Sequence, residues 1–241
     1  MKFMRVKIAP EEYMRLPEGE RLFLFQMLHF LNEVRMLDIV ILVPNNQLEQ
    51  LENPEKGARI ARSLFFMKVL AGVLHEAWKA ISSTYFPLAK SRKYDLPKVS
   101  EDALKNLSKY FAKPDNLVKH IRNKHAFHHD RDRFSEGIGK LLPGDDLEIL
   151  MSELDANFFC HLAETVDNAA LLAYIDPSDE KLAFDTLFDD LLSDVSVWFK
   201  NFAGGFCYEV GNRLQSKMLD EDFNVVSISE VDLPYFVKRD P

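Results

Sequence analysis

A chain of 241 residues with 47% apolar and 28% charged side chains has the composition of a soluble globular protein and can bury a substantial core. Its net charge of -8 disfavours a general polyanion binder, because non-specific binding to nucleic acid depends on neutralising phosphates. Two cysteines without a CxxC motif, an N-terminus unlike a signal peptide and apolar runs far shorter than ~20 residues predict a cytoplasmic protein with neither disulfides nor a membrane span.

The N-terminal half contains two strong helix patterns. Residues 1–17 form a lead with, at best, the alternation of a short edge strand. A helix start at Glu18 is followed by apolar side chains spaced four and three residues apart, which predict a helix to about Ile41. A second pattern of the same kind extends from Ile60 to Ile81 and has further apolar residues on its flanks. We therefore expect this second helix to pack on more than one side.

Shorter patterns follow in the middle of the chain. The stretch 85–99 contains two prolines and a basic run, which predict a mobile basic loop. A helix is expected at 100–112, and a second one, which carries several histidines, begins after Pro114. Glycines and a proline between Gly137 and Asp146 are typical of turns and favour a small hairpin.

The C-terminal part again reads as helix. Helices are predicted at 154–175 and, after the start signal at 176–179, to about Phe199. The pair Gly204-Gly205 is expected to interrupt or loosen this helix, and 225–229 could form a strand.

These patterns predict an all-α fold, a helical bundle with small β additions in the C-terminal half. The expected organisation is an N-terminal lead at 1–17, a helical bundle at 18–132 and a C-terminal helical extension at 133–241, packed on the same core. No internal repeat or low-complexity tract suggests another arrangement.

A basic segment within this acidic chain is the strongest candidate for a functional site. From Lys105 to Arg133 there are eight Lys or Arg residues and three Asp residues, a net charge of +5 in a chain of -8. The segment also holds four of the seven histidines, which are His120, His125, His128 and His129. A local cationic surface could hold a phosphate-bearing ligand even though the whole chain is acidic.

Three interpretations of this segment remain open. His125 and His128 extend the apolar face defined by Ile121, so both could be hydrogen-bonded core histidines. His125 and His129 have the i, i+4 spacing of two metal ligands on one helix face, but no third ligand is spaced along the helix. In the third interpretation a histidine transfers protons near neutral pH while Arg122 binds a phosphate, which suits RNA cleavage by the neighbouring 2′-hydroxyl without a metal.

The string Arg122-Asn123-Lys124, followed by Phe127-His128-His129-Asp130, resembles the Arg-polar-x-His motif of HEPN domains (higher eukaryotes and prokaryotes nucleotide-binding), particularly their abortive-infection branch. Arg122, Asn123 and His128 match the motif, and His129 is a second candidate because the spacing of the motif is loose. Asp130 matches an acid often found just after the histidine. The resemblance covers residues 18–132 at most, and the C-terminal part has no counterpart in it.

The resemblance implies an all-α, metal-independent endoribonuclease of a phage-defence or toxin–antitoxin type, with RNA as substrate, no cofactor and an antitoxin or regulatory protein as a possible partner. Arg122, Asn123, His128 and His129 would be its catalytic residues, and Lys119, Lys124 and Asp130 would bind substrate. Arg122 and His128 are six residues apart, roughly 120° on an ideal helix. They could meet if the helix loosens near Phe127, or across a homodimer in which two copies of the helix face each other, as they do in the family.

A non-catalytic function is the alternative. Some members of the family only bind nucleotides or partner proteins, and the acidity of this chain is compatible with that outcome. Arg122, Asn123 and His128 would then hold together the interface of a helical dimer that acts as an interaction module.

Overall fold

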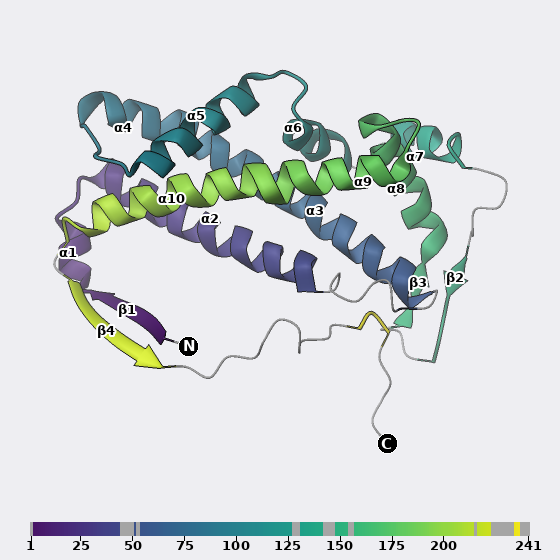
Figure 1. Cartoon of the computed structure of the whole chain (residues 1–241), viewed down its shortest axis with the longest axis horizontal. Coiled ribbons are helices and arrows are strands. Elements are labelled where there is room, and N and C mark those ends of the chain that lie inside the picture. The colour runs from purple at the N-terminus through teal and green to yellow at the C-terminus, as the bar shows by residue number, and fades with distance from the viewer. Residues whose placement is uncertain are drawn as a thin grey trace. The chain divides into compact units, whose positions relative to one another are not determined.

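The computed structural model describes residues 2–43, 51, 54–126, 131–141, 148–153, 157–214, 216–222 and 234–236. Helices dominate this part of the chain, with two small two-stranded sheets, so the predicted all-α class with small β additions is confirmed (Figure 1). None of the described helices is long and apolar enough to cross a membrane.

The chain forms two compact units, and each is made of three segments that are separate in the sequence. The first unit consists of Met1–Arg35, Val73–Asn116 and Asp194–Ser227. The second consists of Met36–Gly72, Leu117–Ser193 and Ile228–Pro241. Helices α2 (Glu18–Leu42) and α3 (Glu55–Ala80) supply residues to both units.

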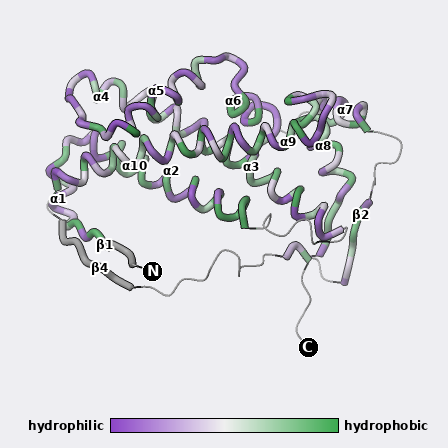
Figure 2. Tube along the Cα trace, in the orientation of Figure 1, coloured by the Kyte–Doolittle hydropathy of each residue, from purple (hydrophilic) through white to green (hydrophobic). Residues whose placement is uncertain are grey.

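The two long helices follow the periodicity of the sequence. On α2 the four-three spacing buries most of one face, with Phe23, Met27, Val34 and Ile41 all at 0% exposure. Hydrophobic and hydrophilic residues alternate along the helices in the manner expected of half-buried elements (Figure 2). Helix α3 buries residues on a wider arc, as its apolar flanks predicted, although Phe65 is exposed.

Part of the predicted basic loop at 85–99 is helical, so this prediction was wrong for its first residues. A π-helical turn at Ile81–Tyr85 is followed directly by α4 (Phe86–Ser91), and only the residues after Ser91 leave the helix. Pro87 lies in the first turn of α4, directly after the π-helical turn, and the helix continues past it to Ser91.

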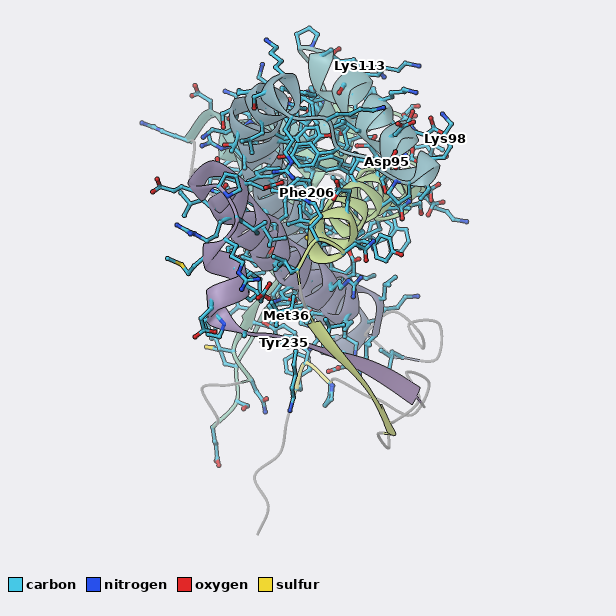
Figure 3. The ribbon with its side chains drawn as sticks, turned by 90° about the vertical axis from the view of Figure 1, so that its left-hand side faces the viewer. Met36, Asp95, Lys98, Lys113, Phe206 and Tyr235 are labelled. Atoms are coloured by element: carbon cyan, nitrogen blue, oxygen red, sulfur yellow. The ribbon has the colours of Figure 1, made fainter. Side chains whose placement is uncertain are left out.

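Helices α5 (Lys98–Ala112) and α10 (Ser196–Gly211) pack side by side in the first unit (Figure 1). An aromatic cluster fills the interior of this unit. Its ring centroids lie 4.9 Å apart for Phe23 and Phe206 and 4.9 Å for Tyr85 and Phe202. Phe206 points inward among the side chains, whereas Lys98 at one end of α5 extends outward (Figure 3). Burial of these large rings stabilises the unit.

The predicted interruption at Gly204-Gly205 was wrong, because α10 passes through both glycines without a break. Gly205 instead allows α10 to approach α5 closely. A Cβ at this position would lie 1.9 Å from Ser100 Oγ and 2.6 Å from Ser100 Cβ, and that hydroxyl donates a 2.8 Å hydrogen bond to the Asn201 carbonyl. Gly204 has nothing within 4 Å of the same hypothetical atom.

These neighbouring glycines provide a matched pair of substitutions. Gly205→Ala should destabilise the protein by ~1–3 kcal/mol or more, since overpacking forces two helices apart. Gly204→Ala should stabilise it by ~0.5–1 kcal/mol, because alanine lowers the entropy cost of forming a helix. Urea unfolding followed by circular dichroism measures both. Equal stabilities of the two variants would contradict the close contact between α5 and α10.

The first unit also contains a small two-stranded sheet. Strand β1 (Lys2–Ile8) pairs antiparallel with β4 (Ser216–Asp222), with Val6 opposite Met218. The lead at 1–17 therefore contains a full strand and the short helix α1 (Pro10–Met14). The predicted strand at 225–229 lies outside the described residues, and the observed β4 precedes it.

The second unit contains shorter elements. They are α6 (Leu117–Ile121), a π-helical turn (Arg122–Ala126), α7 (Arg131–Ile138), β2 (Ile149–Leu150), β3 (Phe159–Cys160), α8 (His161–Ile175), α9 (Glu180–Phe188) and a second π-helical turn (Asp189–Val195), whose last two residues belong to the first unit. The start signal at 176–179 is confirmed, because the Asp179 side chain accepts a hydrogen bond from the Leu182 amide and caps α9.

Two predictions in this unit were wrong. The helix expected from Leu154 begins at His161, because Phe159 and Cys160 pair with β2 as a strand. Gly137 lies inside α7 rather than in a turn, and a Cβ there would be 2.0 Å from the Val166 carbonyl oxygen of α8. Glycine at this position thus allows α7 and α8 to pack closely.

A C-terminal segment is attached to the start of α3 in the same unit. The Glu55 carboxylate accepts hydrogen bonds from the backbone amides of Tyr235 at 2.6 Å and Phe236 at 3.1 Å, and from Arg59 Nε at 2.7 Å. The Tyr235 ring packs 5.1 Å from that of Phe159. Burial alone would raise the pKa of Glu55, but the hydrogen bonds from Arg59, Tyr235 and Phe236 outweigh it and lower the pKa, so the carboxylate is charged in the folded protein.

Candidate functional site

The candidate site begins where helix α6 changes into the π-helical turn. Val118 and Ile121 of α6 are fully buried and anchor it in the second unit. The turn Arg122–Ala126 then presents Asn123 and Lys124 to solvent and buries His125. The sequence therefore produces a two-sided element, with a basic polar face outside and a histidine inside.

Four of the seven predicted site residues are described by the structure. Lys119, Asn123 and Lys124 are exposed, and Arg122 is half-buried. Among its contacts, Arg122 Nη1 donates a 3.0 Å hydrogen bond to the Asn123 side-chain oxygen. Arg122 and Asn123 therefore contact each other at the surface.

The other three predicted residues, His128, His129 and Asp130, lie outside the described residues. The assignments of these three residues therefore stay predictions. The metal interpretation paired His125 with His129, and His129 is one of these three residues. Within the ranges that the structure describes, no three His, Cys, Asp or Glu residues are grouped so that they could hold a metal.

The π-helical turn changes the geometry that the sequence implied. A π-helical turn has i→i+5 hydrogen bonds in place of i→i+4, and such turns frequently occur at functional sites. It occupies Arg122–Ala126, directly before the position where convergence of Arg122 and His128 required the helix to loosen. The rotation of 100° per residue of an ideal α-helix therefore does not hold within Arg122–Ala126.

A buried polar network lies behind the basic face. His125 is 7% exposed, and its Nδ1 lies 3.9 Å from Asp167 Oδ1 of α8. The second carboxylate oxygen of Asp167 pairs with Lys68 Nζ of α3, which also donates a 3.0 Å hydrogen bond to Asn168 Oδ1. The carboxylate of Asp167 thus compensates the charge of a lysine that is only 5% exposed.

His120 is held by stacking and is neutral at pH 7. Its ring lies parallel to that of Tyr174, with centroids 3.4 Å apart and an interplanar angle of 4°. The centroid of His125 is 5.5 Å from that of His120. Burial, with smaller contributions from His125 and Lys124, lowers the pKa of His120 to about 4. His120 is therefore a poor proton carrier near neutral pH, in agreement with its absence from the predicted catalytic set.

A pocket of about 120 Å³ lies beside these histidines. Its lining includes His120, Lys124 and His125, together with Asp132 and Glu136 of α7 and Tyr174 of α8. Sequence reasoning missed the last three residues and the Lys68–Asp167 pair. The one sequence signal for Lys68 was its charge within the apolar run of α3. Its partners could not be predicted, because they come from a distant segment of the chain.

Comparison with known proteins finds no relative of this chain. The chain matches no protein-family model, and no curated protein or solved structure is significantly similar to it. The observations that bear on function are therefore the sequence motif and the local geometry of the site.

Proposed function

We propose that the protein is a HEPN-like, metal-independent endoribonuclease of a defence or toxin–antitoxin type. The observation that carries the proposal is the contact of Arg122 with Asn123 at the surface, in a basic segment whose sequence goes on to His128-His129. The π-helical turn beneath these residues supports it, since irregular helical turns are common at functional sites.

The proposed chemistry is cleavage of RNA by its own 2′-hydroxyl. His128 removes the proton of the hydroxyl, whose oxygen attacks the phosphorus, while the bond to the 5′-oxygen breaks and that oxygen takes up a proton. Arg122 stabilises the additional negative charge on the phosphate through its bidentate donors. Asn123 orients these groups, and His129 can exchange roles with His128. Lys119, Lys124 and Asp130 contact the substrate.

A homodimer is part of the proposal, with residues 114–130 near its two-fold axis. A symmetric interface places the same patch on both subunits, so each copy would complete the site of the other. Sedimentation velocity should therefore show a dimer at micromolar concentration. A monomer under these conditions would count against both the dimer and the shared site.

The decisive experiment is incubation of the purified protein with labelled cellular RNA in EDTA. Cleavage should persist in the chelator, because a histidine–arginine mechanism uses no metal. Cleavage by wild type that disappears in EDTA would refute the mechanism. If wild type cleaves nothing while it remains a dimer, the non-catalytic interaction module replaces the nuclease proposal.

A further inference from the structure

A second pocket, in the first unit, has a lining that is chemically different from the candidate nuclease site. Its volume is about 250 Å³, and it lies between the end of α1, the residue after α4 and the residues after α10. Three arginines line it, Arg15, Arg92 and Arg213, with Glu12 as the one acidic residue among its lining residues. This excess of positive charge occurs in a chain of net charge -8.

A buried carboxylate holds two of the guanidinium groups in place. Glu20, whose side chain is 1% exposed, accepts hydrogen bonds from Arg213 Nη1 at 3.3 Å and from Arg92 Nη1 at 3.4 Å, and also pairs with Arg213 Nη2. Arg213 Nε lies 3.3 Å from a Glu209 carboxylate oxygen, and its guanidinium lies 5.8 Å from the centre of the Tyr94 ring. Arg213 is thus fixed on several sides before any ligand arrives.

Arg92 and Arg15 retain donors for a ligand. Within the described part of the chain, Arg92 contacts a single carboxylate, Glu20 at 3.4 Å, and Arg15 contacts Glu12 at 2.7 Å. A guanidinium carries five N–H donors in a planar fork. The side chains of Arg15 and Arg92 are 65% and 45% exposed, so the remaining donors are accessible from solution.

The three carboxylates that contact these arginines balance their formal charge, so anion binding depends on the guanidinium donors that Arg15 and Arg92 retain. Glu20 and Glu209 do not line the pocket, and both contact Arg213. Glu12 does line it, but its side chain is only 10% exposed. Leu16 and Leu214 supply an apolar part of the wall and keep the polar donors on one side.

We propose that this pocket binds the phosphate group of a small phosphate monoester. Guanidinium groups that line one pocket can bind the oxygens of a phosphate with charge-assisted hydrogen bonds. The volume is below the roughly 300–1,000 Å³ of sites for drug-sized ligands, which limits the rest of the ligand to a small body. Fixation of Arg213 and Arg92 by Glu20 lowers the entropy cost of binding. The proposal is independent of the proposed ribonuclease activity.

Isothermal titration calorimetry of the full chain with methyl phosphate tests the proposal. Wild type should bind one equivalent saturably. Arg15→Gln and Arg92→Gln should each weaken binding at least ~10-fold, because each removes a charged donor. Arg213 is left unchanged, since its loss would leave the buried Glu20 with one long contact. Circular dichroism checks that each variant is folded, and Arg15→Gln suffices if Arg92→Gln does not fold.

Arg21→Gln is the matched control. Arg21 lies on α2 outside the pocket, is half-buried and contacts the Met14 carbonyl at 3.5 Å, so this variant loses the same charge nearby without losing a lining group. Its affinity should equal that of wild type. The proposal is overturned if wild type shows no saturable binding, if Arg21→Gln weakens binding as much as Arg92→Gln, or if acetate binds as tightly as methyl phosphate.

Discussion

His128→Ala should lower RNA cleavage by ~10²–10⁴-fold, because it removes the group that transfers protons between the attacking and leaving oxygens. Arg122→Lys should be nearly as damaging although it keeps the positive charge, since lysine lacks the planar fork that binds two phosphate oxygens at once. Asn123→Ala should have a smaller effect. Initial rates on a labelled RNA of defined sequence measure all three variants.

His120→Ala provides a control from the same segment. Its ring is stacked on Tyr174 and its pKa is about 4, so its removal should change stability and leave the cleavage rate near that of wild type. His129→Ala shows which of the two adjacent histidines transfers the proton. Folded variants at Arg122 and His128 that retain full activity would refute the catalytic assignment.

Lys68→Met should destabilise the protein by about 3 kcal/mol, because it leaves the carboxylate of Asp167 without its lysine in a mostly buried position. We expect the lower end of the usual range since the Asp167 side chain is 13% exposed. The double variant Lys68→Met/Asp167→Leu removes both charges and should be closer to wild type than the single variant. Chemical denaturation with urea gives the free energies of unfolding.

Lys79→Met is the matched control for this prediction. Lys79 also lies on α3 and pairs with Glu76 at 3.0 Å, but the two side chains are 58% and 44% exposed. Exposed ion pairs contribute little, so its loss should cost less than ~1 kcal/mol. Similar losses for Lys68→Met and Lys79→Met would show that the Lys68–Asp167 pair is not buried in solution.

The sequence by itself determined the features that depend on near neighbours. The four-three spacing on α2 and α3 was enough to identify both helices and the buried face of α2, because residues three or four apart lie on one side of a helix. The cap at Asp179 was equally local, since a side-chain oxygen satisfies an amide three residues ahead. The basic character of the segment around Arg122 also follows from the sequence alone.

The glycines show where local reasoning fails. In a single sequence a glycine indicates flexibility or a turn, which is why Gly137 and Gly204-Gly205 suggested breaks. In the folded chain Gly137 and Gly205 lie inside helices, where the missing Cβ makes room for Val166 and Ser100. Only the position of a second helix reveals this use of glycine, because the close contact joins distant parts of the chain.

Tertiary structure alone decided the partners of the polar groups. Lys68 meets Asp167 across 99 residues of sequence, and Glu55 meets the amide of Tyr235 across 180. The antiparallel pairing of β1 with β4 is equally distant in sequence. Local patterns specify which face of a helix or strand is apolar. The carboxylate that compensates a buried lysine, and the strand that pairs with another strand, come from distant segments and depend on the tertiary fold.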